Sequence, residues 1–130
     1  MAPSEHTANR AEVDRFVLEK IDTVPHLEAL LLLWQQSSDS WTTESVAKRL
    51  WIEPEEATAI LNDLVRLELV ELRDPLQYAY RPSATNDRLL RGVANLYRRE
   101  MIRISRMIHA KPSSAVRAFA RAFRFTKEKE

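Results

Sequence analysis

The segment from His26 to Gln36 most constrains the fold, because a helix formed by it would be apolar on nearly every side. One face would carry Leu27, Leu30, Leu31 and Trp34, and the other faces would carry Leu32 and Leu33. A helix of this kind is usually central and buried. The sequence therefore predicts a core helix, opened by Pro25 in its first turn, with other elements packed around it.

Three amphipathic helices are predicted next to this core helix, one before it and two after it in the sequence. The first spans residues 8–21, with its apolar side chains on one face. The second follows Thr42 or Thr43, either of which can cap it, and the third opens at Pro54. The third has the clearest helical spacing in the chain, formed by Ala57, Ile60, Leu61, Leu64 and Val65.

A short β-hairpin is predicted to follow the third of these helices. Val70–Arg73 alternates apolar and polar residues, and residues 78–80 are rich in aromatic side chains that favour strands. Residues 74–77 between them are suited to a turn, because Pro75 stands at its second position.

One long helix is predicted over residues 85–110, with apolar residues on one side and arginines on the other. Glu100 falls within the apolar side, so we expect a cationic partner such as Lys20. Pro112 ends the helix, and Ser113 or Ser114 can cap a short last helix. That last helix is expected to pack on the core or across a dimer, with a membrane surface as the alternative.

Composition favours a mainly helical protein and leaves little room for catalysis. The chain has one glycine and no cysteine, so a glycine-rich phosphate loop, a disulfide and a thiolate metal site are all excluded. His6, His26 and His109 lack metal-ligand spacing and are interpreted as surface or helix-end residues. We therefore predict no cofactor, no metal and no enzymatic activity.

The location that the sequence favours is the cytoplasm. The first ten residues lack the layout of a signal peptide. The longest apolar stretch, from Ala29 to Trp34, is too short to span a bilayer. We expect no membrane span.

The order helix, helix, turn, helix and two-stranded wing is that of a winged helix-turn-helix. Residues 24–82 resemble this superfamily, and most closely its MarR-type bacterial transcriptional regulators. The matching stretches are Pro25–Leu31, Thr42–Leu50, Ile52–Ala57, Leu61, Leu64–Leu67 and Leu69–Val70. The predicted organisation is an N-terminal helix in residues 1–24, the winged unit in 25–82 and a basic helical extension in 83–130, in one compact domain.

The resemblance implies a transcription-regulator-like protein that binds DNA as a homodimer, with the flanking helices forming the dimer. Three positions depart from the family pattern. Trp51 and Glu68 stand where the family has glycine, and Leu76 stands where the family's wing carries an arginine after Asp74. Without this arginine, the resemblance does not predict the family's usual wing contact with DNA.

Charge argues against DNA as the partner of the third helix. Residues 1–80 hold 7 Lys and Arg against 15 Asp and Glu, whereas residues 81–130 hold 13 against 4. The outer face of the helix after Pro54 carries Glu55, Glu56 and Asp63, which would approach the DNA phosphates. Thr58 and Asn62 can still read bases. The alternative is a winged helix that binds protein and not DNA.

The arginine side of residues 85–110 is the strongest positive feature, with DNA phosphates or an acidic protein as candidate partners. A solvated face, or one neutralised by acidic residues of a neighbouring subunit, is the ordinary alternative. The candidate residues for nucleic-acid or partner binding are Thr58, Asn62, Arg66, Arg73, Arg81, Arg88, Arg91, Arg98, Arg99, Arg103 and Arg106. The candidate residues for dimer or helix packing are Leu90, Val93, Tyr97, Met101, Ile104, Ile108, Phe119 and Phe123.

Overall fold

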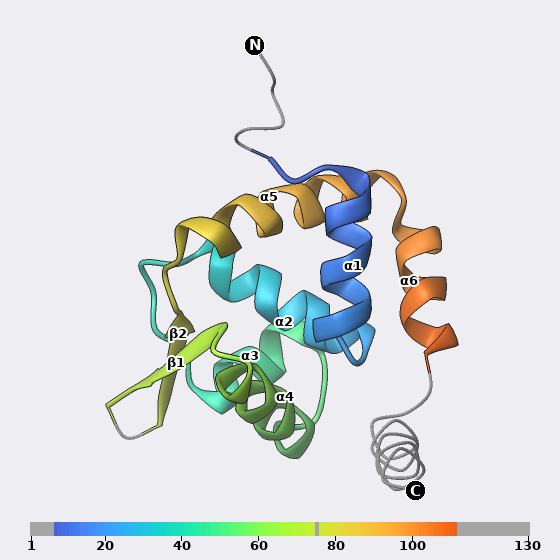
Figure 1. The fold of residues 1–130 in the computed structure, drawn as a ribbon. Helices are drawn as coiled ribbons and strands as arrows, with labels where there is room; N and C mark the ends of the chain where they lie inside the picture. Colours follow the sequence, from blue (N-terminus) through green and yellow to red (C-terminus); the bar gives the residue numbers. More distant parts are fainter. Residues whose placement is uncertain (1–6, 75, 112–130) are drawn as a thin grey trace, which may run out of the picture.

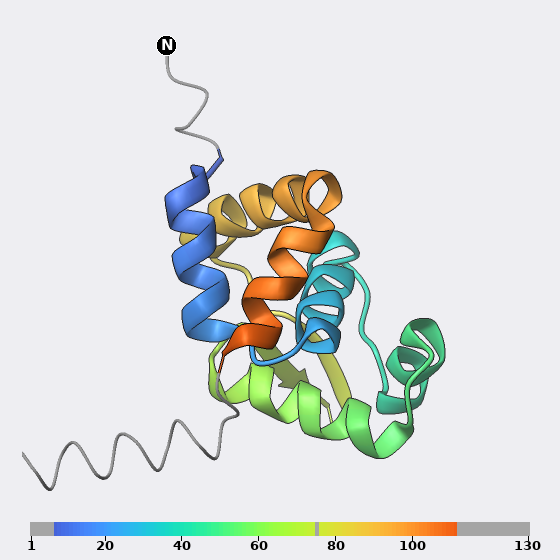
Figure 2. The same cartoon turned by 90° about the vertical axis from the view of Figure 1, so that its right-hand side faces the viewer.

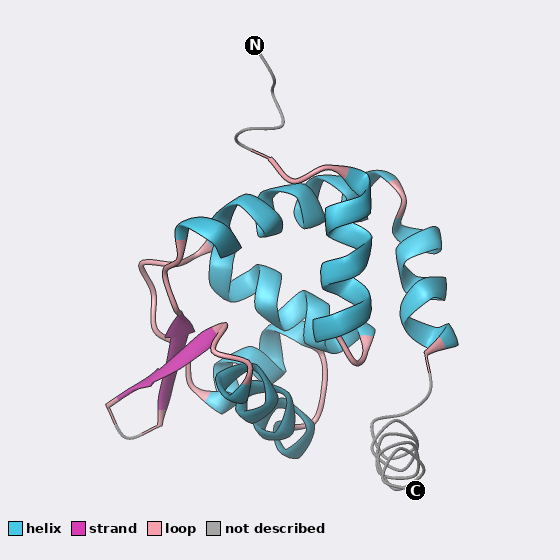
Figure 3. Cartoon of the chain, viewed as in Figure 1, coloured by secondary structure: helices cyan, strands magenta, loops and turns pink. Residues whose placement is uncertain are grey.

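The computed structural model describes residues 7–74 and 76–111, which form six helices and one two-stranded antiparallel sheet (Figures 1 and 3). The helices are α1 (Arg10–Lys20), α2 (Val24–Gln35), α3 (Thr43–Leu50), α4 (Pro54–Arg66), α5 (Ala84–Arg99) and α6 (Met101–Ala110). The strands are β1 (Val70–Arg73) and β2 (Gln77–Tyr80). The expectation of a mainly helical chain with a β-hairpin is therefore confirmed. None of the helices in the described ranges is long and apolar enough to cross a membrane.

Helix α2 is the centre of the core, as its sequence predicts. The Thr23 side chain caps its N-terminus, and Pro25 lies in its first turn. Seven of its residues are buried, and it packs against β2, α3, α4, α5 and α6. In Figures 1 and 2, α5 lies on one side of α2 and α4 lies on the opposite side.

Helices α3 and α4 are joined by a tight turn with a left-handed residue. Thr42 and Ser45 form a reciprocal capping box at the start of α3. The helix ends at Trp51, which has φ 59° and is 93% exposed. A non-glycine residue in this region costs about 1–2 kcal/mol, so the packing of α3 on α4 imposes this conformation.

The hairpin extends away from the helices on one side of the molecule (Figure 1). Val70 pairs with Tyr80 and Arg73 with Gln77. Trp41 extends the hairpin by a β-bridge that the sequence pattern does not reveal. Its N–H donates to the Tyr78 carbonyl at 2.8 Å, and its carbonyl accepts from the Tyr78 N–H at 2.7 Å. Glu68, just before the hairpin, has φ 63°.

Helices α1 and α5 approach each other closely at Gly92. A Cβ at this position would lie 2.8 Å from the Ala8 carbonyl oxygen and 2.9 Å from the Val13 side chain. The Ala8 N–H also donates to the Arg88 carbonyl at 3.2 Å. Gly92 is therefore required here for close packing.

The prediction of a single helix over residues 85–110 is wrong, because the helix is interrupted at Glu100. Glu100 has φ −133° and ψ 47°, outside the helical region. The break turns α6 away from the axis of α5, so that α6 packs on α1 and α2 and buries Ile104 and Ile108 (Figure 2). Helical periodicity could not reveal this break, because the apolar residues before and after it keep the same spacing.

Candidate partner-binding surfaces

The outer face of α4 is exposed and predominantly acidic. Glu55 and Glu56 lie in the first turn, where the positive end of the helix dipole stabilises them. Thr58 is exposed, and its hydroxyl donates to the Pro54 carbonyl at 3.0 Å. Asn62 is exposed as well and accepts a hydrogen bond from the Tyr78 hydroxyl at 3.2 Å. Both candidate base-reading residues thus already have partners within the chain.

Arg66 is the basic residue of α4, and its guanidinium pairs with the Asp63 carboxylate. Asp63 also contacts the His26 ring, with 2.8 Å between Oδ2 and Nε2. His26 lies in the first turn of α2, a helix-end position as expected, but a surface role is wrong because the residue is only 7% exposed. The sequence could not show this contact, because His26 and Asp63 are 37 residues apart.

The arginines of the hairpin region are also paired within the chain. Arg73 donates from Nε to Glu71 at 2.7 Å on the same strand. Arg81 donates to Glu68 at 3.5 Å. Neither guanidinium adds an unpaired positive charge to the surface next to α4.

Two arginines of α5 and α6 are bound to acidic residues of α1. Both terminal nitrogens of Arg88 donate to Glu12 at 2.9 Å. This pairing, together with the Asn9 backbone N–H, lowers the pKa of Glu12 to about 2. Arg103 donates to the two carboxylate oxygens of Asp14 at 3.0 and 3.1 Å. These residues are part of the packing of α1 and are not open binding groups.

Glu100 has two cationic partners, and neither is the expected Lys20. Arg103 donates to it at 2.5 Å and Arg10 at 2.7 Å. The bond from Arg103 is the largest cause of the lowered pKa of Glu100. The expectation of Lys20 is corrected because the break at Glu100 points its carboxylate toward the start of α1.

Four candidate arginines remain on the exposed surface of α5 and α6: Arg91, Arg98, Arg99 and Arg106. Arg98 donates weakly to Asn95 at 3.4 Å. Within the described ranges, the guanidinium groups of Arg99 and Arg106 make no hydrogen bond or ion pair. The broad arginine face expected from a single helix is therefore reduced to a few positions.

Four of the eight residues considered for dimer or helix packing are buried in the core of this chain. Leu90, Val93, Ile104 and Ile108 are at most 2% exposed. Tyr97 is half-buried, whereas Met101 is exposed. Phe119 and Phe123 lie outside the described residues. Among the described residues of this set, only Met101 is exposed.

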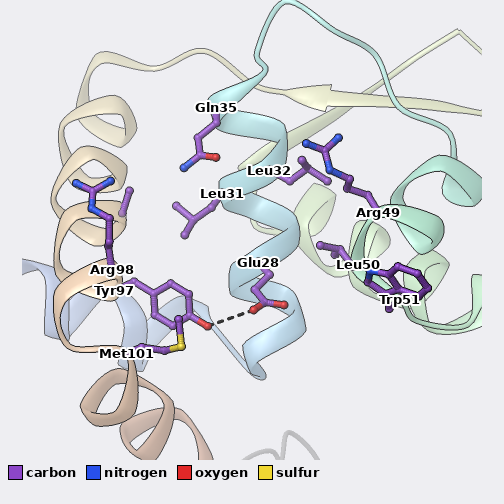
Figure 4. Close-up of a pocket in the computed structure, with 11 residues that line it drawn as sticks. Glu28, Leu31, Leu32, Gln35, Arg49, Leu50, Trp51, Tyr97, Arg98 and Met101 are labelled. Atoms are coloured by element: carbon purple, nitrogen blue, oxygen red, sulfur yellow. Dashed lines mark hydrogen bonds between the residues drawn. The ribbon is translucent and has the colours of Figure 1, made fainter.

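A groove of about 500 Å³ crosses α2 between α3 and α5 (Figure 4). Its floor is formed by Leu31 and Leu32, and Trp51 and Met101 lie at opposite ends. The Tyr97 hydroxyl donates to Glu28 at 3.3 Å within it. Burial, and then the Glu28 charge, raise the pKa of Tyr97. Trp51 is 93% exposed, so this tryptophan does not pack in the core.

The comparisons with known proteins show a fold relationship. No family model matches the chain, and no curated protein matches its sequence. The crystal structure of RV1404 from Mycobacterium tuberculosis is similar, with a TM-score of 0.50 and 20% sequence identity. The alignment covers 91% of this chain and 82% of that chain. At this identity the similarity concerns the fold alone.

Proposed function

We propose that this chain is a non-enzymatic winged-helix protein that binds a protein partner through the exposed face of α4. The order of α2, α3, α4 and the hairpin supports the winged-helix interpretation. Trp51 and Glu68 support it further, because both have positive φ at the positions where MarR-type proteins carry glycine. The backbone therefore adopts the left-handed geometry of these turns with non-glycine residues.

The acidic face of α4 is the observation that carries the proposal. A recognition helix that binds DNA brings its outer residues to the base edges and phosphates. Here that face begins with Glu53, Glu55 and Glu56, all exposed. Because DNA is a polyanion, these carboxylates favour a positively charged protein surface.

The pairing of the arginines strengthens the same conclusion. The positive charges of Arg66, Arg73 and Arg81 lie close enough to α4 or the hairpin to assist DNA binding, and each is paired with an acidic neighbour. These three guanidinium groups therefore contribute less to the counterion release that drives DNA affinity.

Two charge-reversal variants test the docking face. Wild type, Glu55→Lys with Glu56→Lys, and Arg99→Glu with Arg106→Glu would be cross-linked in cells to their native partners. We expect the first double variant to lose the cross-linked partner and the second to retain it, because all four residues are exposed and only the first pair lies on the proposed docking face. Equal capture by all three proteins would exclude α4 as the docking face.

DNA binding by a homodimer is the second candidate, favoured by the exposed guanidinium groups of Arg99 and Arg106, which have no partner among residues 7–74 and 76–111. Fluorescence anisotropy with labelled genomic fragments at about 50 and 200 mM salt separates the two candidates. Tight binding that falls steeply with salt, together with a dimeric mass by light scattering, would support this candidate. An absence of binding at low salt would leave the protein-docking proposal.

A further inference from the structure

Three metal-ligating side chains converge where the start of α2 meets the end of α4. Asp22, His26 and Asp63 each offer one ligand atom, and these atoms all lie within 4.8 Å of one another. Asp22 precedes α2, His26 lies in its first turn, and Asp63 comes from α4. The imidazole is buried and the carboxylates are half-buried, so the group is not a solvated acidic cluster.

The neighbouring residues hold His26 and Asp63 in a fixed orientation. The Thr23 hydroxyl lies 2.6 Å from His26 Nδ1, and Asp63 Oδ2 lies 2.8 Å from Nε2. Arg66 binds the other Asp63 oxygen, Oδ1, so that Oδ2 is the oxygen directed at the ring. Protein metal sites usually hold their histidine and carboxylate ligands by such outer contacts.

The Thr23 contact also allows the neutral ring to change its tautomer without losing the bond at Nδ1. A hydroxyl both donates and accepts, so Thr23 can bond Nδ1 whether or not Nδ1 carries the proton. In the metal-free chain, Nε2–H can donate to Asp63. On metal binding, the ring proton is held at Nδ1 and donated to Thr23, and the Nε2 lone pair is then free to bind the ion.

We propose that Asp22, His26 and Asp63 bind a divalent transition metal of the zinc class. Zinc accepts imidazole nitrogen and carboxylate oxygen, with bonds of about 2.0–2.2 Å, so tetrahedral ligands lie about 3.4 Å apart. To reach this geometry, His26 Nε2 and Asp63 Oδ2 would have to open from 2.8 Å, and the widest pair of ligand atoms would have to close from at most 4.8 Å. Magnesium and calcium prefer oxygen donors alone, so the imidazole disfavours both.

Nearby positive charges will moderate the affinity. Arg66 shares Asp63, and the Lys111 ammonium bonds to the carbonyl of Ile21, the residue before Asp22. The N-terminus of α2 is also the positive end of its dipole. Two carboxylates offset these charges, and three protein ligands leave a position for water. The bound ion would tie the start of α2 to the helix whose exposed face is proposed to dock a partner.

Metal titration of the full chain tests the site directly. Zinc would be followed by isothermal titration calorimetry, and cobalt(II) by its visible absorption, with magnesium as a comparison ion. We expect one zinc ion per chain, a cobalt spectrum typical of mixed nitrogen and oxygen ligands, and no response to magnesium. Zinc should also raise the thermal midpoint, because it binds the folded chain.

Asp22→Asn is the decisive variant, because it removes one ligand and leaves the bond between His26 and Asp63 in place. It should weaken zinc binding by at least about tenfold, the lower limit for loss of a supporting metal contact. His109→Gln is the matched control, since His109 is exposed and outside the group, and its affinity should equal that of wild type. Absence of saturable zinc binding, or equal binding by Asp22→Asn and wild type, would overturn the site.

Discussion

The exposed face of α4 and the surface where α1 meets α5 and α6 differ in whether their charged side chains face solvent or form ion pairs. On α4 the leading glutamates project into solvent, and Arg66 is the basic residue of the helix. At the second surface, arginines of α5 and α6 bind acidic residues of α1 over nitrogen–oxygen distances of 2.9–3.1 Å, and Arg10 of α1 binds Glu100 at 2.7 Å. The first surface leaves its charge exposed to solvent, and the second pairs its charge within the packing of α1.

This difference shows why net charge along the sequence is a poor guide to a binding surface. The basic second part of the chain and the acidic first part are partly neutralised by each other, because α1 contributes Glu12 and Asp14 to the arginines. On α4, by contrast, Glu55 and Glu56 of the first turn remain exposed. Charge must therefore be counted after folding, not along the sequence.

Gly92→Ala should have the largest effect on the packed surface. Its new Cβ would lie 2.8 Å from a backbone oxygen, so α1 and α5 must separate. We expect a loss of about 1–3 kcal/mol in the free energy of unfolding, as for other overpacked positions. Urea denaturation measures it. A stability gain, as expected from alanine's helix propensity alone, would show that α1 does not pack there.

Paired and exposed arginines should differ clearly when each is replaced by alanine. Arg103→Ala removes bonds to Asp14 and Glu100, and should cost about 1–2 kcal/mol of unfolding free energy. Arg99→Ala should stay within about 0.5 kcal/mol, as for most surface changes. The two variants can be compared in one denaturation series. Equal losses would mean that the ion pairs at α1 do not support the fold.

Glu12 gives the packed surface a specific acid sensitivity. Its pKa is lowered to about 2 in the folded chain from an ordinary 4.5, chiefly by Arg88. The stabilisation by the Glu12 carboxylate is complete above pH about 4.5 and is lost as the pH falls through about 2. The free energy of unfolding of Glu12→Gln, taken from unfolding curves, should therefore depend less on pH between about 4.5 and about 2 than that of wild type.

The reciprocal variant Arg88→Gln should also weaken the pH dependence of unfolding over the same pH range, because it removes the cation that lowers the pKa of Glu12. Both variants keep a polar side chain at the substituted position. If the acid limb of wild type and of both variants coincided, another group would have to govern the acid response.

The sequence by itself determined helices α1 to α4, the hairpin and the central position of α2. Local signals were sufficient for these features: helical spacing in α4, Pro25 and Pro54 in first turns, Thr42 as a cap, and alternation in β1. These signals act over a few residues, and a pattern that is apolar on nearly every side can be satisfied only by burial. The acidic outer face of α4 also follows directly from its spacing.

Only the tertiary structure decided where the helix after residue 84 breaks and which charges remain open. Glu100 leaves the helical region where its carboxylate meets Arg10, a contact across 90 residues. The contact of His26 with Asp63 and the left-handed geometry of Trp51 likewise depend on how α2, α3 and α4 pack. Such features arise from residues far apart in the chain, and short-range periodicity does not report which of them will meet.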